Sequence, residues 1–567
     1  MWKSSWRGAA ALLILGLIPA SLVVVTLDFG HRKAALRFSQ GPEVPTLDPQ
    51  KMQDVSGGRI AGALFEGLAV FDPVTASPKP GVAHRWDISD DGLVYTFHLR
   101  DDARWSDGSQ LTAEDFRYSW RRALDARTGS PYNYLLFAIK GSREYVEATT
   151  GLAEMSPEQA DAVVEAAAAR LGIEAVSPTV LRVTLERPTR AFIDLVAFHT
   201  LLPVKQSSVE TSRRVRAGDD PTDPAWTHPG RIVSNGPYVL DEWKLKYRMR
   251  LVRNEHYWNR KHVRVPTIDV YPAESPETVY LQYELGQLDL ITDVPNLAAE
   301  QLLKERRAGR RLDFHGFPYC GTYFLRFNCT KPPLDDRRVR LALSLALDKQ
   351  EIVDRAGRLG QPVARTFVPE GQIPWYKGPE GHGRDVERAR RLLAEAGYPG
   401  GKGFPTLRYL YNTSEAHKRI AELVAEQWRR ELGIVLTLQN IEWKVFLEKV
   451  GTLDYDIARA AWIADYLDPM TFLDMFVTGG GNNDTGWSNP EYDRLIGEAG
   501  DTVDMERQAD IFRRAEAILI EEEMPVAPVY YYVSASLVRD RVKGYVPNPL
   551  NRIAFEDLWI DAAEGGP

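Results

Sequence analysis

The feature of this sequence that most constrains its fold is the alternation of strand-like and helix-like patterns along most of the chain. Residues 93–99 carry large apolar side chains at every second position, which is typical of a strand buried on one face. Ser106-Asp107-Gly108 predicts a turn, and Thr112 with Asp115 predicts a capping box that begins a helix. Apolar side chains then recur at helical spacing: Phe116, Trp120, Ala123 and Leu124. This order favours an α/β architecture over a helical bundle or a β-sandwich.

Further helices and strands are predicted after this unit. Ser156-Pro157 places a capping side chain before a proline and so begins a helix, which Gly172 is expected to end. Residues 420–432 form an apolar helical stripe, and Gly433 suits the left-handed conformation that ends a helix. Residues 434–438 are predicted to form a buried strand.

Length and charge limit the class of protein. A chain of 567 residues, 44% of them apolar, exceeds one hydrophobic core and is expected to divide into two or three domains. The formal net charge is -8, and Lys and Arg are scattered rather than clustered. The sequence therefore gives no electrostatic footprint for a nucleic acid or an anionic membrane surface, and we expect neither as a partner.

The N-terminal region indicates export. Lys3 and Arg7 precede an uncharged, largely apolar stretch at 8–27. This stretch exceeds the usual core of a cleaved signal peptide, roughly 7 to 15 residues, and is long enough to cross a bilayer as a helix. An uncleaved signal anchor is therefore expected, with a cleaved signal peptide as the alternative. Because no cysteine follows the stretch directly, the lipid attachment common in secreted bacterial proteins has no acceptor.

The chain has only two cysteines, Cys320 and Cys329, within a strand-like segment. In an extended strand they would lie about 30 Å apart, at ~3.3 Å per residue, which is far beyond the reach of a disulfide bond. Two unpaired thiols are therefore predicted.

One segment places charges of opposite sign in an otherwise apolar run. Arg459, Trp462 and Asp465 follow one another at three-residue intervals among mostly small or apolar side chains. Burial of an ionised group without a partner is costly, so each charge must be paired, solvated or neutralised by a ligand. An internal ion pair between Arg459 and Asp465, beside a packed Trp462, is one interpretation. A small ligand that carries both charges is the other.

A family resemblance is carried by segments spread from about Phe38 to the C-terminus. They are, in order, Glu43-Val44-Pro45-Thr46-Leu47-Asp48-Pro49, Leu64-Phe65-Glu66-Gly67-Leu68, Tyr95-Thr96-Phe97-His98-Leu99-Arg100, Trp105-Ser106-Asp107-Gly108, Thr112-Ala113-Glu114-Asp115-Phe116-Arg117-Tyr118-Ser119-Trp120, Ser234-Asn235-Gly236-Pro237-Tyr238, Tyr257-Trp258, Arg337-Arg338-Val339-Arg340-Leu341-Ala342 and Leu347-Asp348-Lys349. This ordered set resembles the extracytoplasmic oligopeptide-binding proteins of ABC importers, in the peptide/nickel class, or family 5, of solute-binding proteins. Tyr411-Asn412-Thr413-Ser414 and Glu442-Trp443 are similar to the peptide-binding branch.

The resemblance implies an α/β, two-lobed periplasmic-binding-protein-like fold of type II, with an extra inserted domain and a ligand cleft between the lobes. The implied domains are an N-terminal signal or anchor (1–35), lobe I (36–56, 181–318 and 533–567), the inserted domain II (57–180) and lobe II, or domain III (319–532). Chain crossings near Tyr319 and Tyr532 would form the hinge about which the lobes close on a ligand.

The resemblance also implies roles for five residues. Asp465 matches the family's anchor for the peptide ammonium, whereas Arg459 and His417 match residues that receive the peptide carboxylate. Trp443 and Trp462 match indoles that form walls of side-chain pockets. From the residues alone, His417 could equally be an exposed helix histidine, and each tryptophan could be an ordinary core residue.

Three weaker candidates complete the implied site. Glu43 matches a carboxylate near the amino end of the ligand. Tyr132 and Tyr319 are further candidates to line the cleft, and ordinary packing is the alternative for both.

Departures from the family pattern limit what the resemblance implies. Some relatives join the hinge strand to the tryptophan-containing segment by a disulfide bond. Here Ile463 occupies one of those positions and Cys320 is displaced by one residue from the other, so that bond is expected to be absent. Arg355 and Arg358 follow a position where a basic residue can meet longer peptides, but neither aligns securely.

The function that the resemblance implies is a monomeric extracytoplasmic receptor that binds short peptides by their termini and delivers them to the permease subunits of an ABC transporter. A membrane-tethered peptide sensor or chaperone is one alternative, because a fold does not fix a physiological role. A peptide hydrolase is the other. The residues do not favour it, since there is no His-Glu-x-x-His motif and Gly479-Gly480-Gly481 lacks the Lys-Ser/Thr of a phosphate loop. No catalytic residue, metal or cofactor is therefore predicted.

Overall fold

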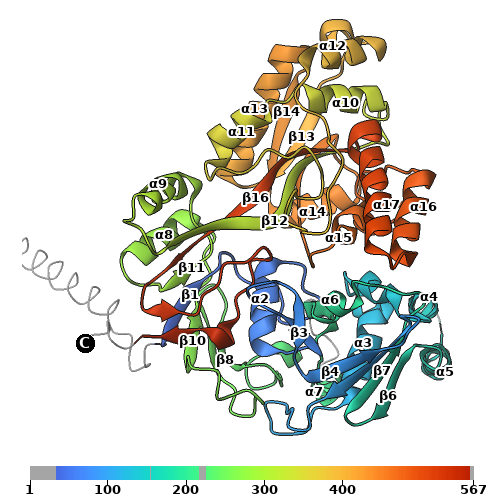
Figure 1. The fold of residues 1–567 in the computed structure, drawn as a ribbon, viewed down its shortest axis with the longest axis vertical. Coiled ribbons are helices and arrows are strands. Elements are labelled where there is room, and N and C mark those ends of the chain that lie inside the picture. Colours follow the sequence, from blue (N-terminus) through green and yellow to red (C-terminus); the bar gives the residue numbers. More distant parts are fainter. Residues whose placement is uncertain (1–33, 153–154, 216–224, 562–567) are drawn as a thin grey trace, which may run out of the picture. The chain divides into compact units, whose positions relative to one another are not determined.

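A mixed sheet is the largest element of the fold (Figure 1). The structure, a computed structural model, describes residues 34–152, 155–215 and 225–561. In sheet order the strands are β14 (Leu436–Ile441), β13 (Leu407–Asn412), β15 (Ile457–Ile463), β12 (Phe314–Phe327), β16 (Val526–Val538), β11 (Leu290–Ile291), β1 (Leu36–Ser39), β10 (Thr267–Val270), β9 (Arg248–Arg253) and β8 (Tyr238–Lys244). Parallel pairs join β1 to β10 and β11, and β13 to β14 and β15, whereas the other neighbours are antiparallel.

Two long antiparallel strands, β12 and β16, run side by side through the middle of this sheet (Figure 1). They pair from Phe314 opposite Leu537 to Arg326 opposite Val526, with an irregularity between Pro318 and Thr322. The crossings predicted near Tyr319 and Tyr532 fall within these strands. The predicted domain limits themselves remain a prediction.

A separate antiparallel sheet contains the predicted strand, turn and helix. Its order is β4 (Ala83–Ile88), β5 (Val94–Leu99), β7 (Val180–Thr184) and β6 (Ile173–Ser177). Every second side chain of β5 is buried, and α3 (Ala113–Leu124) packs against β6 and β7 with its apolar stripe buried. The backbone N–H of Thr112 donates to Asp115 Oδ2 at 2.8 Å, which confirms the reciprocal half of the capping box. A hydrophobic core of its own lies between these elements.

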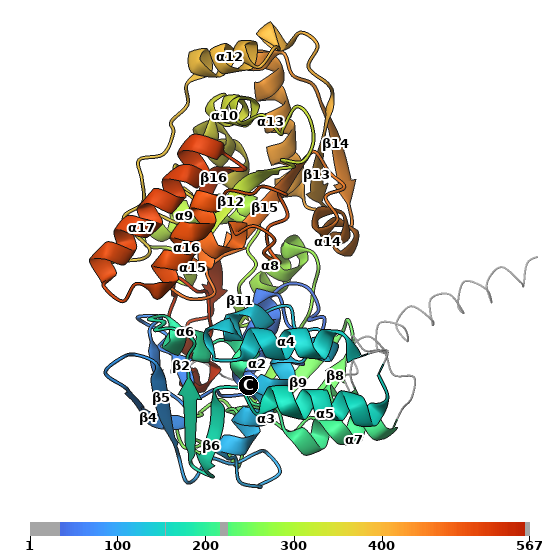
Figure 2. The same ribbon diagram turned by 90° about the vertical axis from the view of Figure 1, so that its right-hand side faces the viewer.

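The helix that Ser156 caps ends earlier than predicted. This helix, α5 (Pro157–Ala168), packs with α4 (Ser142–Thr150) (Figure 2). The N–H of Gln159 donates to Ser156 Oγ at 3.3 Å, as the capping box requires. Gly172 does not end the helix, because its backbone already bonds to Lys140 and Thr184 as the chain enters β6.

A second group of helices covers β13 and β14. The stripe at 420–432 lies on α13 (Glu415–Leu432), which packs on both strands (Figure 2), and Gly433 ends the helix with φ +69°, as predicted. The strand predicted at 434–438 is shifted and is not fully buried. It begins at Leu436 as β14, an edge strand whose side chains are only partly covered, because β13 pairs with it on one side only.

The remaining elements are shorter or lie outside the two sheets. The helices are α2 (Val55–Leu64), α6 (Phe192–Val196), α7 (Gln206–Val215), α8 (Pro276–Glu284), α9 (Asn296–Arg307), α10 (Arg337–Leu345), α11 (Lys349–Ile352), α12 (Val386–Glu395), α14 (Trp443–Gly451), α15 (Met470–Leu473), α16 (Pro490–Asp501) and α17 (Met505–Ala517). Two strand pairs complete the fold: β2 (Ala69–Phe71) with β3 (Pro78–Pro80), and β17 (Val542–Lys543) with β18 (Trp559–Ile560).

Two predictions concern the N-terminal region and the cysteines. Between residues 34 and 561, in the described ranges, no helix combines the length and apolar character needed to cross a membrane. The stretch at 8–27, on which the anchor prediction rests, lies outside the described residues. Cys320 and Cys329 both carry free thiols, as predicted, so no disulfide bond ties β12 to the segment of Ile463.

Candidate ligand-binding site

A cavity of about 490 Å³ is enclosed by segments far apart in the sequence. One group of lining residues comes from α2 and the chain up to β3, and another from residues 548–556 near the C-terminus. Across the cavity lie Trp443, at the start of α14, and the end of β15 with the residues that follow it. Four of the predicted site residues line the cavity: Tyr132, Trp443, Trp462 and Asp465.

Strand β15 and the turn after it position three of the predicted site residues. Because β15 is paired on both sides, with β12 and β13, its side chains are held in fixed register. Arg459 lies opposite Leu325, and Trp462 lies opposite Thr322. The strand ends at Ile463, so Asp465 follows directly, at the edge of the cavity.

Asp465 has no cationic partner at ion-pair distance among the residues that the structure describes. Its Oδ2 accepts a hydrogen bond from Thr471 Oγ1 at 3.4 Å, and its own backbone N–H donates to that hydroxyl at 3.3 Å. The surrounding protein raises the pKa of the carboxyl to about 7, chiefly by desolvation, while the nearby charge of Arg552 limits the rise. A ligand cation at this position would favour the ionised carboxylate.

Arg459 is likewise without a carboxylate partner within the described ranges. Its side chain is only 8% exposed. Its Nε donates to Asn412 Oδ1 at 2.7 Å, and the guanidinium lies 5.4 Å from the ring centres of both Trp443 and Phe446. The internal ion pair between Arg459 and Asp465 is therefore not formed, and the rest of the guanidinium fork has no carboxylate to bind.

His417, in the first turn of α13, lies near Arg459; like Arg459, it is not among the residues that line the cavity. The ring lies 5.8 Å from that of Tyr323, and its Nδ1 is buried without a hydrogen-bond partner. Burial first, and then the charge of Arg459, hold the pKa of His417 well below its usual value. A neutral imidazole with an unused nitrogen next to a guanidinium can donate to a carboxylate that the guanidinium binds.

The two tryptophans form walls of the cavity. The ring of Trp443 stacks on Phe446 with 5.6 Å between ring centres, and its side chain is 49% exposed, so it is no core residue. Trp462 is partly buried, and its indole Nε1 has no hydrogen-bond partner in the structure. An indole donor that borders a cavity suits the backbone carbonyl of an extended ligand.

The weaker candidates fall in different places. Tyr132 lines the cavity and packs edge-on against Phe198 at 5.3 Å. Tyr319 is buried in β12 against Tyr532, 6.2 Å away, and does not line the cavity. Glu43 does not reach the cavity either, because its carboxylate accepts from Trp243 Nε1 at 3.0 Å and from the backbone N–H of Lys246 at 2.6 Å.

Several cavity residues had no signal in the sequence. Arg59 and Arg552 both line the cavity. Arg59 lies hundreds of residues before Asp465 in the sequence, and Arg552 lies 87 residues after it. Glu66 belongs to a segment that carries the family resemblance, but no role was assigned to it. Its carboxyl accepts from Tyr257 Oη and from Trp258 Nε1 at 2.7 Å, and burial raises its pKa to about 7.

Comparison with known proteins identifies the family. Residues 77–484 match the model of the bacterial extracellular solute-binding proteins, family 5 Middle. The chain therefore belongs to family 5 of the bacterial extracellular solute-binding proteins. The periplasmic oligopeptide-binding protein OppA of Salmonella typhimurium is 35% identical to this family 5 chain, over 93% of each sequence.

Solved structures of the family agree with the fold described above. The murein tripeptide binding protein MppA of Escherichia coli is 31% identical, with a TM-score of 0.81 over 94% of this chain and 99% of that one. Haemophilus influenzae OppA, in complex with RPPGFSPFR, is 30% identical. Its structure matches with a TM-score of 0.80, over 93% of this chain and 98% of that one. The predicted α/β fold of the periplasmic binding proteins is thus confirmed.

Proposed function

We propose that this family 5 protein is an extracytoplasmic receptor that holds short peptides by both termini and delivers them to an ABC transporter. The observation that carries the proposal is a pair of charges: Asp465 lines the cavity, and Arg459 lies next to Trp443, which lines it too. The two charges have opposite sign, and neither forms an ion pair within the described residues, although Arg459 is buried and Asp465 is partly buried. A peptide supplies an ammonium and a carboxylate at its two ends.

The contacts of the site support an assignment of roles. Asp465 binds the ammonium with help from Thr471 Oγ1. Arg459, fixed by Asn412, receives the carboxylate in a bidentate manner, and neutral His417 donates a further hydrogen bond. The flat faces of Trp443 and Trp462 accommodate side chains of different shapes, so this receptor tolerates many sequences. The site holds and releases its ligand, with no catalytic step.

Closure and attachment belong to the same proposal. One lobe consists of residues 36–56, 181–318 and 533–567, and the other of residues 319–532, while residues 57–180 form an inserted domain. The two lobes close on the ligand about β12 and β16. One hydrophobic core, with residues between 323 and 530, falls wholly within 319–532 and supports that lobe. The core of the small sheet runs mainly from residue 68 to 201, across the proposed limit at 180. The receptor acts as a monomer, and residues 8–27 tether it to the membrane, which fractionation of cells that express the full chain would test.

The experiment that tests the function is direct. Freshly purified full-length protein is exchanged into ligand-free buffer, incubated with a mixture of di- to pentapeptides, and analysed by native mass spectrometry. We expect bound masses that equal intact peptides, at one peptide per chain. Failure to retain any peptide would contradict the proposal, and the steady release of shorter products would show a hydrolase instead.

A further inference from the structure

Arg552 is a second guanidinium in the cavity, and it lies beside the predicted ammonium anchor. It lines the cavity from the segment between β17 and β18, with its guanidinium 4.0 Å from the ring centre of Phe71 and 5.9 Å from that of Phe198. Within the described part of the chain, its side chain donates one hydrogen bond, from Nη2 to the backbone carbonyl of Asp465 at 3.2 Å. It forms no ion pair with any described carboxylate.

The turn that carries Arg552 is fixed by its own hydrogen bonds. The backbone N–H of Arg552 donates to Asn548 Oδ1 at 3.1 Å, and Asn548 Nδ2 donates back to the Arg552 carbonyl at 2.8 Å. Asn551 donates to Ser534 Oγ at 2.9 Å, and its carbonyl accepts from Arg59 Nε at 3.0 Å. The guanidinium is thus presented by a preorganised support, so little ordering is needed when it binds a ligand.

The charge near Arg552 changes sign when a peptide ammonium binds. In the free protein, the nearest charge that favours the Arg552 cation is Asp465, whereas desolvation lowers the pKa of Arg552 to about 10. Once the ligand ammonium takes Asp465, that carboxylate is shared between the ammonium and Arg552. Asp54, Glu66, Asp72 and Glu556 also line the cavity, but none of these described carboxyl groups forms an ion pair with Arg552. The second guanidinium of the cavity, Arg59, is a further cation, and the charges of Asp293 and the cavity-lining Asp54 act on it. An uncompensated buried cation is costly unless a further anion is supplied.

We infer that Arg552 forms a carboxylate subsite next to the ammonium anchor, so that the receptor prefers peptides whose first or second residue is Asp or Glu. This inference rests on the proposed peptide function and adds a preference to it. The ligand then brings an ammonium for Asp465 and a side-chain carboxylate for Arg552, and the four charges alternate in sign. A planar guanidinium clamped over Phe71 retains its fork for bidentate binding of that carboxylate.

Matched peptides test the subsite in the wild-type protein. Isothermal titration calorimetry compares Glu-Ala-Ala with Gln-Ala-Ala, and Ala-Glu-Ala with Ala-Gln-Ala, because each pair differs in one charge and hardly in shape. We expect at least one acidic peptide to bind about tenfold tighter than its amide partner, the usual gain of a charge-assisted hydrogen bond. Equal affinities within both pairs would overturn the inference. If tri-alanine and all four peptides fail to bind, the proposed function itself is wrong.

Three variants then locate the effect. Arg552→Gln should abolish the preference for the acidic peptide while tri-alanine binds as tightly as before or tighter, because the ammonium no longer competes with a guanidinium for Asp465. Arg552→Lys keeps the charge and should retain part of the preference, which guards against a folding defect in the first variant. Arg264→Gln is the control, since Arg264 is exposed and stacks on Trp559 outside the cavity. A preference that survives in Arg552→Gln would contradict the assignment.

Discussion

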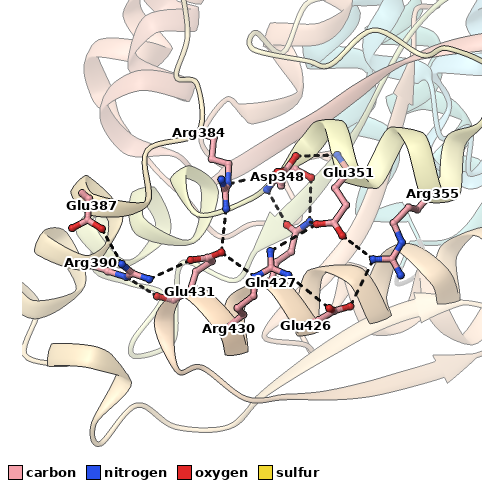
Figure 3. A network of polar contacts seen from close by, with 10 residues as sticks. All are labelled: Asp348, Glu351, Arg355, Arg384, Glu387, Arg390, Glu426, Gln427, Arg430 and Glu431. Atoms are coloured by element: carbon pink, nitrogen blue, oxygen red, sulfur yellow. Dashed lines mark hydrogen bonds and ion pairs between the residues drawn. The ribbon is translucent and has the colours of Figure 1, made fainter.

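Two charged regions of this molecule are built in opposite ways. On the surface formed by α11, α12 and α13, arginines and carboxylates form a continuous network (Figure 3). Arg430 alone reaches Glu431 at 3.0 Å, Glu426 at 3.7 Å and Glu351 at 3.8 Å. Asp465 and Arg552, which line the cavity, and Arg459, next to Trp443, lack any such partner within the described residues.

The difference shows that the single charges of the cavity do not result from a shortage of countercharges. The chain carries 70 Lys and Arg against 78 Asp and Glu, and on its surface it pairs them repeatedly. Exposed charges that gain little from pairing are paired, and so are the buried Arg122 and Asp48, whereas Asp465, Arg459 and Arg552 form no ion pair among the described residues. The network also includes Arg355, which pairs with Glu351 at 2.7 Å, while Arg358 lies 3.5 Å from Glu300.

The largest expected effect is the loss of the ammonium anchor. Asp465→Asn keeps the shape of the side chain but removes its charge, so a bound ammonium would be left without a countercharge. We expect tri-alanine to bind more weakly by about 2 to 5 kcal/mol, measured by calorimetry at pH 8. Glu426→Gln, which removes a carboxylate from the surface network, is the matched control. Equal losses in both variants would erase the distinction between the two regions.

The other end of the peptide should matter somewhat less. In Arg459→Gln the hydrogen bond to Asn412 can be kept, but the guanidinium charge is lost. We expect a loss of about 1.5 to 3 kcal/mol for tri-alanine, the range for hydrogen bonds to charged groups. The amidated peptide provides the check, because it has no carboxylate to lose. If the variant weakened the amidated peptide to the same extent, Arg459 would not be the carboxylate partner.

Stability should depend on pH through Asp465. Its folded-state pKa of about 7 lies above the value of an exposed carboxyl, so its contribution to stability is fully present below about pH 4 and is lost as the pH rises to 7. Ligand-free Asp465→Asn should therefore be more stable than the wild type by roughly 2 kcal/mol at pH 8, and by less at pH 5. Denaturant unfolding at both pH values measures this. A gain that is the same at both would contradict the pKa assignment.

The smallest effect is expected at the surface network. Arg355→Ala removes ion pairs between exposed side chains, which are screened by water and salt. The free energy of unfolding should fall by at most about 1 kcal/mol, and by less at about 0.5 M salt. The affinity for tri-alanine should stay unchanged. Chemical denaturation at two salt concentrations measures the first quantity. A larger, salt-independent loss would mean that this region is not merely a solvated surface.

The sequence pattern predicts correctly those helices and strands that depend on residues close together in the chain. The strand at β5 and the caps at Thr112 and Ser156 depend on residues a few positions apart, so the sequence was sufficient. Where an element depends on its neighbours in space, the prediction failed. β14 has the pattern of a buried strand but lies at a sheet edge, and α5 stops before Gly172 because β6 already begins there.

The candidate site divides in the same way. Arg459, Trp462 and Asp465 lie on one strand and its turn, so their spacing could be read along the chain. Asn412, which fixes Arg459, and Arg552, which approaches Asp465, come from distant segments that only the fold brings together. For Glu43, the resemblance placed a carboxylate near the ligand, whereas the structure binds it to Trp243 and Lys246.

The most direct test of the account titrates the wild-type protein with tri-alanine in three forms: with both ends free, with the amino end acetylated, and with the carboxyl end amidated. If Asp465 and Arg459 bind the two termini of the peptide, each cap should weaken binding at least tenfold, and the acetyl group should weaken it more than the amide. Both losses should be the same in a variant of the surface network such as Glu426→Gln. Capped peptides that bind as tightly as the free one would show that these charges serve another purpose.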